Sequence, residues 1–408
     1  MQTKLSTSLL STKSGKEADS ILRSCVHCGF CTATCPTYQL TGDELDGPRG
    51  RIYLIKQALE ETAVTEKTLK HLDRCLVCRS CETTCPSGVR YHNLLQIGKE
   101  TVEQQVGRPL TQRFMRWGMR TLLPYPARFS PLFKLGSIFR PLMPAALKAK
   151  MPVTRDPGSR PARQHARRVI LFEGCVQQVV AKSINAAASR VLDRLGISCM
   201  TAHGEGCCGA VSNHTGDMPA GEEIARRNID SWLPHLDAGA EAIVTTASAC
   251  GLEIREYPYL LREDPAYAAK AERIAGAVMD ISEYLSQAVE AADLQLADSL
   301  PEISFHTPCT LQHGLGQAGT VEGLLQRLGF GVRTPADSHL CCGSAGTYSI
   351  LQPAMATQLR DNKLEKLDAE NAGIIATANI GCMMHLQSGT GTEVRHWIEI
   401  IDSSLAGR

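Results

Sequence analysis

The sequence predicts a multi-domain protein in which an all-α N-terminal module is followed by two copies of an α/β unit. A cysteine run occurs twice, at 25–36 and 75–86, with a helical pattern between the copies. A second set of cysteines recurs in two later segments at a nearly constant offset. Those segments alternate short apolar runs with helical stretches, which is the pattern of a parallel sheet covered by helices.

Both N-terminal runs follow C-x2-C-x2-C-x3-C-P, the spacing of two-cluster bacterial ferredoxins. In that arrangement three cysteines of one run and the last cysteine of the other hold each [4Fe–4S] cluster. The predicted ligand sets are therefore Cys25, Cys28, Cys31 and Cys85 for one cluster, and Cys75, Cys78, Cys81 and Cys35 for the other. Structural zinc takes four ligands in two pairs, and disulfides need an oxidising compartment, so both alternatives fit poorly.

Composition is that of a globular protein. Of 408 residues 43% are hydrophobic and 21% charged, and the net charge of +1 gives no bulk affinity for nucleic acid. Neither the apolar core of a signal peptide nor a run of about 18–20 apolar residues is found. We expect a cytoplasmic location, where clustered cysteines indicate metal rather than disulfides.

The N-terminal module is expected to span 1–107. Helices are predicted at 17–24, at 51–59 and at about 92–105, because apolar residues recur at helical spacing. Small ferredoxins carry a β-hairpin between their cluster loops. The helical pattern of this insert favours an all-α module instead.

A connecting segment is expected at 108–167. From 108 to 168 the chain holds fourteen Arg and Lys against one acid, Asp156, with aromatic residues interleaved. Such a stretch can lie on an anionic membrane surface or dock on a partner. Ordinary packing between two domains is the open alternative, while nucleic acid is disfavoured.

The two α/β repeats are expected at 168–290 and 300–408. The interval from Cys175 to Cys309 equals the interval from the motif Cys-Cys-Gly at 207–209 to its copy at 341–343. The last cysteines, Cys250 and Cys382, are separated by nearly the same interval. Unrelated segments would not share this offset, so we predict two copies of one unit.

Each repeat contributes four cysteines that follow predicted strands or open glycine turns. Ligands bind at the carboxyl ends of strands in open α/β sheets. The candidate metal ligands are Cys175, Cys207, Cys208 and Cys250 in the first repeat, and Cys309, Cys341, Cys342 and Cys382 in the second. A further cluster or zinc, a redox dithiol and buried apolar packing all remain open. Cys199 has no counterpart and is expected to serve packing.

The histidines carry a weaker signal. His27 lies inside the first cluster loop, where its ring could bond a sulfur. His203, His306, His313 and His339 lie near the later cysteines. For each of them, a core or surface histidine with its bonds satisfied is the expected state.

No G-x-G-x-x-G follows a predicted strand to open a helix, and no P-loop, nucleophile elbow or H-E-x-x-H motif is found. Iron–sulfur clusters move single electrons. We therefore expect a partner that carries the two-electron centre, and no catalytic residue in this chain.

The chain resembles the glycolate oxidase iron–sulfur subunit family along its whole length. The matching stretches are 25–38, 42–52, 81–92 and 339–347. The wider group to which it is similar comprises the cysteine-rich subunits of heterodisulfide reductase, anaerobic glycerol-3-phosphate dehydrogenase and lactate-utilisation proteins. Domains of the heterodisulfide reductase type end in C-x-x-C, whereas Ala247 and Asn379 stand at the first place of that pair here.

The resemblance implies a non-substrate-oxidising subunit of a complex that converts glycolate, a 2-hydroxy acid, to glyoxylate. Electrons would pass from FAD-containing partner subunits through two [4Fe–4S] clusters toward membrane quinone. The chain would then be associated peripherally with the cytoplasmic face of the inner membrane. The alternative is a related lactate, glycerol-3-phosphate or heterodisulfide-type oxidoreductase with thiol chemistry at the Cys-Cys-Gly sites.

Overall fold

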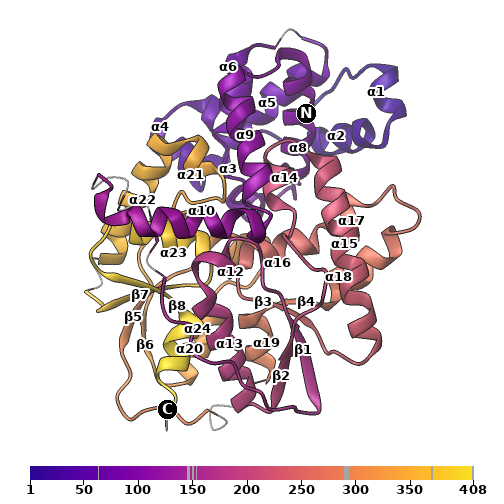
Figure 1. Ribbon diagram of the computed structural model, residues 1–408. Helices are drawn as coiled ribbons and strands as arrows, with labels where there is room; N and C mark the ends of the chain where they lie inside the picture. Colours follow the sequence, from indigo (N-terminus) through magenta and orange to yellow (C-terminus); the bar gives the residue numbers. More distant parts are fainter. Residues whose placement is uncertain are drawn as a thin grey trace. The chain divides into compact units, whose positions relative to one another are not determined.

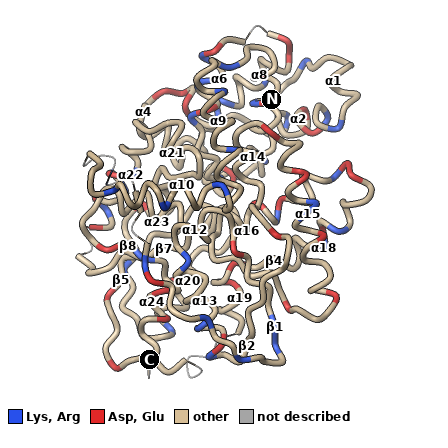
Figure 2. The backbone as a smooth tube through the Cα atoms, viewed as in Figure 1, with Lys and Arg blue, Asp and Glu red and all other residues tan. Residues whose placement is uncertain are grey.

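The computed structural model describes residues 1–62, 64–144, 148, 151–152, 154–288, 294–368 and 371–406 (Figure 1). The expected repeat ends at 290 and 408 lie outside these residues. The chain forms two compact units. The first unit comprises Met1–Met115 and His339–Leu359, and the second comprises Arg116–Ser338 and Arg360–Arg408. Basic and acidic residues are mixed along the backbone of both units (Figure 2).

The N-terminal part of the first unit is helical, which confirms the predicted all-α module. Its elements are α1 (Thr7–Ser11), α2 (Lys13–Ser24), α3 (Phe30–Ala33), α4 (Pro36–Thr41), η1 (Glu44–Asp46), α5 (Pro48–Leu59), α6 (Glu66–Asp73), α7 (Ser80–Thr84) and α8 (Tyr91–Val106). Leu22, Ile55, Leu72 and Leu94 are fully buried in its core. The short helices α3 and α7 each begin within a cysteine run, so they help to place the cluster loops.

Helix α5 is the insert for which the sequence predicted a helix. Pro48 occupies its first turn, where a missing N–H costs nothing. It packs against α8 at a glycine: a Cβ at Gly98 would lie 2.5 Å from Ile55 Cγ1. The two helices therefore approach closely, and together they bring Arg51 and Tyr91 to the cysteine loops.

The second part of the first unit, His339–Leu359, comes from far along the chain. It contains the second Cys-Cys-Gly motif, α21 (Tyr348–Leu351) and the start of α22 (Pro353–Asp368). The Tyr348 hydroxyl donates to the carbonyl of Arg74 at 3.2 Å, immediately before Cys75. This bond ties the segment to a cluster loop.

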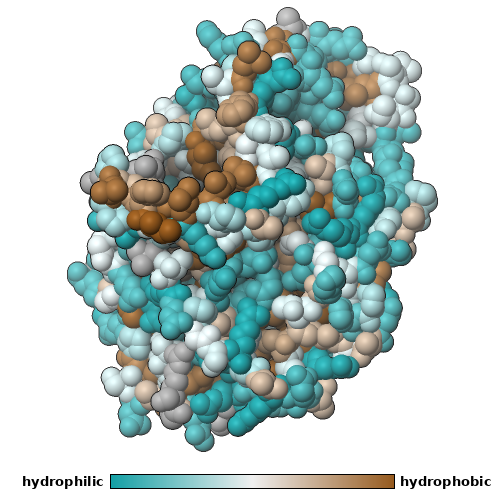
Figure 3. All heavy atoms as spheres, viewed as in Figure 1, coloured by the Kyte–Doolittle hydropathy of each residue, from teal (hydrophilic) through white to brown (hydrophobic). Residues whose placement is uncertain are grey.

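The connecting segment holds α9 (Leu110–Leu122), α10 (Pro126–Phe139) and η2 (Arg140–Leu142). Several large apolar side chains of this segment are exposed, among them Ile138 at 71% and Leu142 at 81%. Brown, hydrophobic atoms gather over α10 in Figure 3. No helix in the described part of the chain combines the length and hydrophobicity that a membrane crossing requires.

The first repeat is a four-stranded parallel sheet in the order β2-β1-β3-β4. The strands are β1 (Arg167–Leu171), β2 (Ile197–Met200), β3 (Ile243–Thr245) and β4 (Val278–Asp280). Its helices are α12 (Gln177–Val180), α13 (Lys182–Arg194), α14 (Ala210–His214), α15 (Met218–Asp237), α16 (Ser248–Arg255), α17 (Tyr257–Leu260), α18 (Ala268–Ala277) and α19 (Ile281–Ala288).

The second repeat has the equivalent order, β6-β5-β7-β8, again all parallel. Its elements in the second unit are β5 (Glu302–His306), η3 (Thr310–Gly314), α20 (Thr320–Arg327), β6 (Gly331–Arg333), β7 (Ile374–Thr377), α23 (Ile380–Gln387), β8 (Glu393–His396) and α24 (Trp397–Ser403). The matching strand orders confirm the repeat predicted from the cysteine offsets.

The two sheets share one hydrophobic core through equivalent helices. Helix α13 of the first repeat packs on α24 of the second, and α19 packs on α20, with Trp397 fully buried (Figure 1). Arg190 makes a two-bond pair with Asp402 at 2.9 and 2.8 Å. His396 Nε2 lies 2.8 Å from the Thr246 carbonyl oxygen. These contacts join the two sheets within the second unit.

Candidate metal centres

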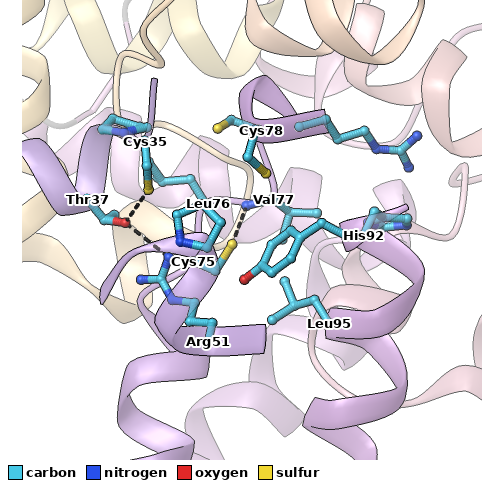
Figure 4. Close-up of a pocket in the computed structure, with 14 residues that line it drawn as sticks. Cys35, Thr37, Arg51, Cys75, Leu76, Val77, Cys78, His92 and Leu95 are labelled. Carbon is cyan, nitrogen blue, oxygen red and sulfur yellow. Dashed lines mark hydrogen bonds between the residues drawn. The ribbon is translucent and has the colours of Figure 1, made fainter. Parts of the chain in front are cut away.

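The first unit contains two pockets that take cysteines from both N-terminal runs. The Cys75 pocket is lined by Cys75, Cys78, Cys81 and Cys35, and Figure 4 shows its labelled side chains. The Cys25 pocket is lined by Cys25, Cys28, Cys31 and Cys85, and also by Cys81. Each pocket thus gathers three cysteines of one run and the last cysteine of the other.

The two cluster loops share an unusual backbone. His27 and Gly29 in one loop, and Val77 and Arg79 in the other, all have positive φ, between 54° and 85°. Three of these residues carry a Cβ, for which this conformation is costly. The bends turn backbone N–H groups inward, as at Val77, whose N–H donates to Cys75 Sγ at 3.4 Å. Such concave runs of N–H groups suit anionic sulfur ligands.

A buried arginine lies beside the Cys75 pocket. Arg51 is 1% exposed, and it donates from Nε to the His71 carbonyl at 2.8 Å and from Nη1 to Thr37 Oγ1 at 3.1 Å (Figure 4). Thr37 Oγ1 is 3.3 Å from Cys35 Sγ. Burial opposes the charge, but Cys75, Tyr91, Cys35 and Asp46 raise the pKa of Arg51, so it stays cationic.

The charge of Arg51 is balanced by an equally buried acid. Asp46 is 0% exposed, and its Oδ1 lies 3.7 Å from Arg51 Nη2. Asp46 also pairs with Arg74 at 2.6 Å and lies 2.9 Å from His71 Nδ1. Two arginines thus face one carboxylate, which leaves a net positive charge beside the Cys75 pocket.

Tyr91 lines both pockets and is 5% exposed. Burial, followed by the nearby Cys75, raises the pKa of Tyr91 well above its usual value, so the phenol stays neutral.

In the Cys25 pocket, burial and then Cys25, Cys28, Cys35 and Cys85 raise the pKa of Cys31 to about 11. Four thiolates at such a site would repel one another, and the positive irons of a cluster would remove that penalty. The donor set therefore fits iron–sulfur clusters.

The first repeat brings its four cysteines together at the carboxyl ends of neighbouring strands. Cys175 follows β1 and Cys250 lies in the first turn of α16, just after β3. The thiols of Cys175 and Cys208 donate to Cys207, which lowers the pKa of Cys207 well below its usual value. Those bonds raise the pKa of Cys175 and Cys208 in turn, and Cys208 also interacts with Cys250.

The turn at Gly209 makes this cluster possible. Gly209 has φ 101°, a conformation that L-residues avoid, and its N–H donates to Cys207 Sγ at 3.4 Å. Tyr257 donates to the Cys208 carbonyl at 2.8 Å and is itself fully buried. Four thiols in contact could hold zinc or a cluster, because both take thiolate ligands.

In the second repeat, two predicted ligands lie in the second unit. Cys309 follows β5 and Cys382 lies in the first turn of α23 after β7; both are buried. Asn379 Nδ2 donates to Cys382 Sγ at 3.6 Å. The other two, Cys341 and Cys342, are buried in the segment of the first unit, where Gly343 donates to Cys341 Sγ at 3.4 Å.

Three residues near these sites have surroundings that the sequence did not reveal. Arg51 occurs on the apolar face of α5, and a charge at a buried helical position was the available signal. Tyr91 lies outside both cysteine runs, so no motif marked it. His306 differs from expectation: it is 1% exposed, yet neither ring nitrogen has a partner among the described residues. Burial lowers the pKa of His306 well below its usual value, so the ring is neutral.

Comparison with known protein families matches both parts of the chain. Residues 21–89 match the 4Fe-4S dicluster domain, and residues 169–255 and 303–387 each match the cysteine-rich domain named CCG. These matches coincide with the cysteine loops of the first unit and with both parallel-sheet repeats.

Two similar relatives span nearly the whole chain. The glycolate oxidase iron–sulfur subunit of Escherichia coli (strain K12) is 53% identical over 406 residues, covering 99% of both chains. The probable glycolate oxidase iron–sulfur subunit of Bacillus subtilis (strain 168) is 30% identical over 402 residues, 91% of this chain and 90% of that protein.

A solved structure shows the same fold. The crystal structure of a hypothetical protein from Helicobacter pylori aligns with a TM-score of 0.57 at 10% identity, covering 97% of this chain and 73% of that chain.

Proposed function

We propose that this chain, which belongs to the glycolate oxidase iron–sulfur subunit family, is the electron-transfer subunit of a flavin-dependent glycolate dehydrogenase complex. Electrons would pass from partner subunits that hold FAD toward membrane quinone. The observation that carries this proposal is the pair of pockets in the first unit, each of which gathers three cysteines of one run and the last cysteine of the other.

Cys25, Cys28, Cys31 and Cys85 would hold one [4Fe–4S] cluster, and Cys75, Cys78, Cys81 and Cys35 the other. When bound, each cluster supplies a one-electron carrier. Arg51 would favour added negative charge in the Cys75 pocket, and the buried Tyr91, which lines both pockets, would limit the access of water to them. No residue of this chain is assigned to the oxidation of the hydroxy acid itself.

The Cys-Cys-Gly cysteines are proposed as additional metal ligands. The four thiols of the first repeat, Cys175, Cys207, Cys208 and Cys250, support this through their mutual contacts. The proposed second set, Cys309, Cys341, Cys342 and Cys382, rests on the sequence repeat.

For the membrane, we propose that α10 and η2 provide a peripheral contact on the cytoplasmic face. The side chains of Leu135, Ile138 and Leu142 are 54%, 71% and 81% exposed. Grouped exposed apolar side chains of this kind mark sites of contact with a membrane or a partner. The surrounding basic residues would attract anionic lipid. Ile138→Ser should then reduce flotation with vesicles that contain anionic lipid, whereas unchanged flotation would contradict the contact.

The electron-transfer role is tested by comparing the isolated chain with the complex that also contains the flavin subunits. Glycolate should leave the isolated, anaerobically purified chain oxidised, as judged by its electron paramagnetic resonance (EPR) spectrum. When the flavin subunits are added, glycolate should reduce the clusters within the turnover time. Glycolate oxidation by the isolated chain, or clusters that stay oxidised in the active complex, would contradict the proposal.

Thiol chemistry at the first Cys-Cys-Gly site is a second candidate, favoured by the low pKa of Cys207 among buried thiols. In that case Cys207→Ser would abolish reduction of a disulfide substrate while the N-terminal clusters stay intact. Loss of metal from the first repeat in that variant, without any disulfide reductase activity in the wild type, favours the metal-binding role instead.

A further inference from the structure

Tyr91 lies in the wall of both cysteine pockets of the first unit. It is the first residue of α8, and Leu94 and Leu95, one turn further along the same face, are buried with it. This apolar face holds the ring in place, and a phenylalanine would pack there equally well. The hydroxyl group that a tyrosine adds at this position therefore requires an explanation of its own.

The Tyr91 hydroxyl is buried and has no hydrogen-bond partner among the described residues. The hydroxyls of the other buried tyrosines in the described chain all donate to a protein oxygen, at 2.8, 2.7 and 3.2 Å for Tyr257, Tyr284 and Tyr348. Buried polar groups are nearly always paired, because an unpaired one costs free energy. An acceptor bound in a pocket would remove that cost.

The hydroxyl lies on the side of the Cys75 pocket. After burial, Cys75 is the group that most raises the pKa of Tyr91, and its thiol approaches the hydroxyl without the geometry of a hydrogen bond. Arg51 and Cys81, which line the same pocket, are the next groups that act on the phenol. The neutral hydroxyl therefore offers its proton beside the space that the cysteines of this pocket enclose.

The sulfurs of an iron–sulfur cluster are suitable acceptors for this proton. They carry negative charge, and the charge on them grows when the cluster is reduced. A hydrogen bond to sulfur then stabilises the reduced state more than the oxidised state, which raises the reduction potential. Hydrogen bonds to charged acceptors are also stronger than neutral ones.

We propose that the Tyr91 hydroxyl donates a hydrogen bond to a sulfur of the cluster in the Cys75 pocket and raises the potential of that cluster. The ring also lines the Cys25 pocket, but the hydroxyl is its only conventional donor, so the potential of the other cluster is not affected. This inference rests on the two clusters of the proposed function. It adds Tyr91 to the eight cysteines as a residue that contacts a cluster.

The test is Tyr91→Phe in the full chain, purified anaerobically with its clusters. Phenylalanine fills the same space, so iron content should stay at the wild-type value. In a redox titration followed by EPR, the signal that Cys35→Ser removes should shift to lower potential. At a fixed solution potential its ratio of reduced to oxidised cluster should fall about tenfold, or about 59 mV for one electron, while the other signal stays in place.

A second measurement detects the proton itself. After exchange of the wild type into D2O, electron–nuclear double resonance should show a strongly coupled deuteron at the cluster of the Cys75 pocket. The same coupling should be missing in Tyr91→Phe. A wild-type spectrum without any coupled deuteron at that cluster would overturn the proposal without reference to a variant.

Tyr257→Phe is the matched control, because Tyr257 is also a fully buried tyrosine but lines neither pocket. Its hydroxyl already donates to the Cys208 carbonyl, so this variant should lose thermal stability while both potentials stay at the wild-type values. Wild-type potentials in Tyr91→Phe, or an equal shift of both signals, would overturn this inference alone. A wild type with fewer than two clusters would overturn the proposed function as well.

Discussion

The two cysteine pockets of the first unit have the same ligand pattern but different surroundings. The Cys75 pocket includes the buried Cys35 and Cys81 and lies beside the fully buried Arg51. The Cys25 pocket includes the exposed Cys28 and is also lined by Val26 and Phe30, which are 67% and 60% exposed. One motif therefore yields an interior site with a net positive neighbourhood and a site that opens to solvent.

This difference suggests a direction for electrons. Nearby positive charge and hydrogen bonds to sulfur raise the potential of a cluster, because they stabilise its reduced and more negative state. The Cys75 pocket should hold the cluster of higher potential, and the exposed Cys25 pocket is the better point of entry. The predictions below test this comparison, beginning with the largest expected effect.

Removing one cysteine should remove one identified cluster. Cys35→Ser should lower iron by about four per chain and abolish the EPR signal of higher potential, because Cys35 lines the Cys75 pocket. Cys85→Ser should abolish the other signal. Cys199→Ser, outside both pockets, should leave the iron unchanged. If Cys35→Ser and Cys85→Ser lose the opposite signals, the assignment of pockets is wrong.

Replacing the buried Arg51 with an uncharged residue should bring the reduction potentials of the two clusters closer together. A charge about 6 Å away at an effective dielectric constant of about 20 contributes about 3 kcal/mol, or on the order of 100 mV for one electron. Arg51→Met should therefore lower the potential of the Cys75 pocket by about that amount in a redox titration followed by EPR. Arg51→Lys keeps a positive charge at this position, so it should retain most of the wild-type potential.

Arg49 is the matched control for the other pocket. It lines the Cys25 pocket, but its side chain is 38% exposed and pairs with Glu44. Solvent screens such a charge, so Arg49→Met should shift the potential of either cluster by much less than Arg51→Met. Equal shifts of potential in Arg49→Met and Arg51→Met would contradict the claim that the buried charge of Arg51 distinguishes the two pockets.

Separating α5 from α8 should loosen the Cys75 pocket first, because these helices carry Arg51 and Tyr91. A methyl group at Gly98 would meet Ile55, so Gly98→Ala should destabilise the fold by about 1–3 kcal/mol. Thermal unfolding would measure the loss of stability, and the order in which the two pockets release iron would show which of them loosens first. Gly118→Ala on α9, where a Cβ meets nothing within 4 Å, should instead be neutral or stabilising.

The smallest expected effect concerns entry at the Cys25 pocket. Phe30→Ser removes an exposed aromatic ring beside Cys28 and Cys31, where a partner would dock. Electron transfer from the flavin subunits should slow severalfold, while iron content and both potentials stay unchanged. A wild-type transfer rate in stopped-flow measurements would place the entry point elsewhere.

Much of this architecture could be predicted from the sequence, because it depends on the spacing of cysteines and apolar residues along the chain. The two C-x2-C-x2-C-x3-C runs indicated the ligand sets. The nearly constant offset between matching cysteines indicated two equivalent sheets, which the identical strand orders confirm. Helix α5 was foreseen from the apolar positions between 52 and 59. These features depend on local periodicity or on repetition, both of which are visible in one sequence.

The charges around the sites could not be predicted, because they depend on long-range packing. Arg51 meets Asp46 nearby in sequence, but Arg74 reaches the same carboxylate from beyond the next helix, α6. The partners of Tyr348 and the missing partners of His306 are likewise set by tertiary structure. A single sequence gives the residue types at such positions but not which of them are left unpaired.

The central claim is that the first unit holds two iron–sulfur clusters on cysteines exchanged between its two runs. The most direct measurement is iron and acid-labile sulfide per chain on anaerobically purified protein, with EPR of the reduced state. We predict at least about eight irons with matching sulfide and two reducible [4Fe–4S] signals. Zinc in place of iron, or about four irons with a single signal, would contradict the account.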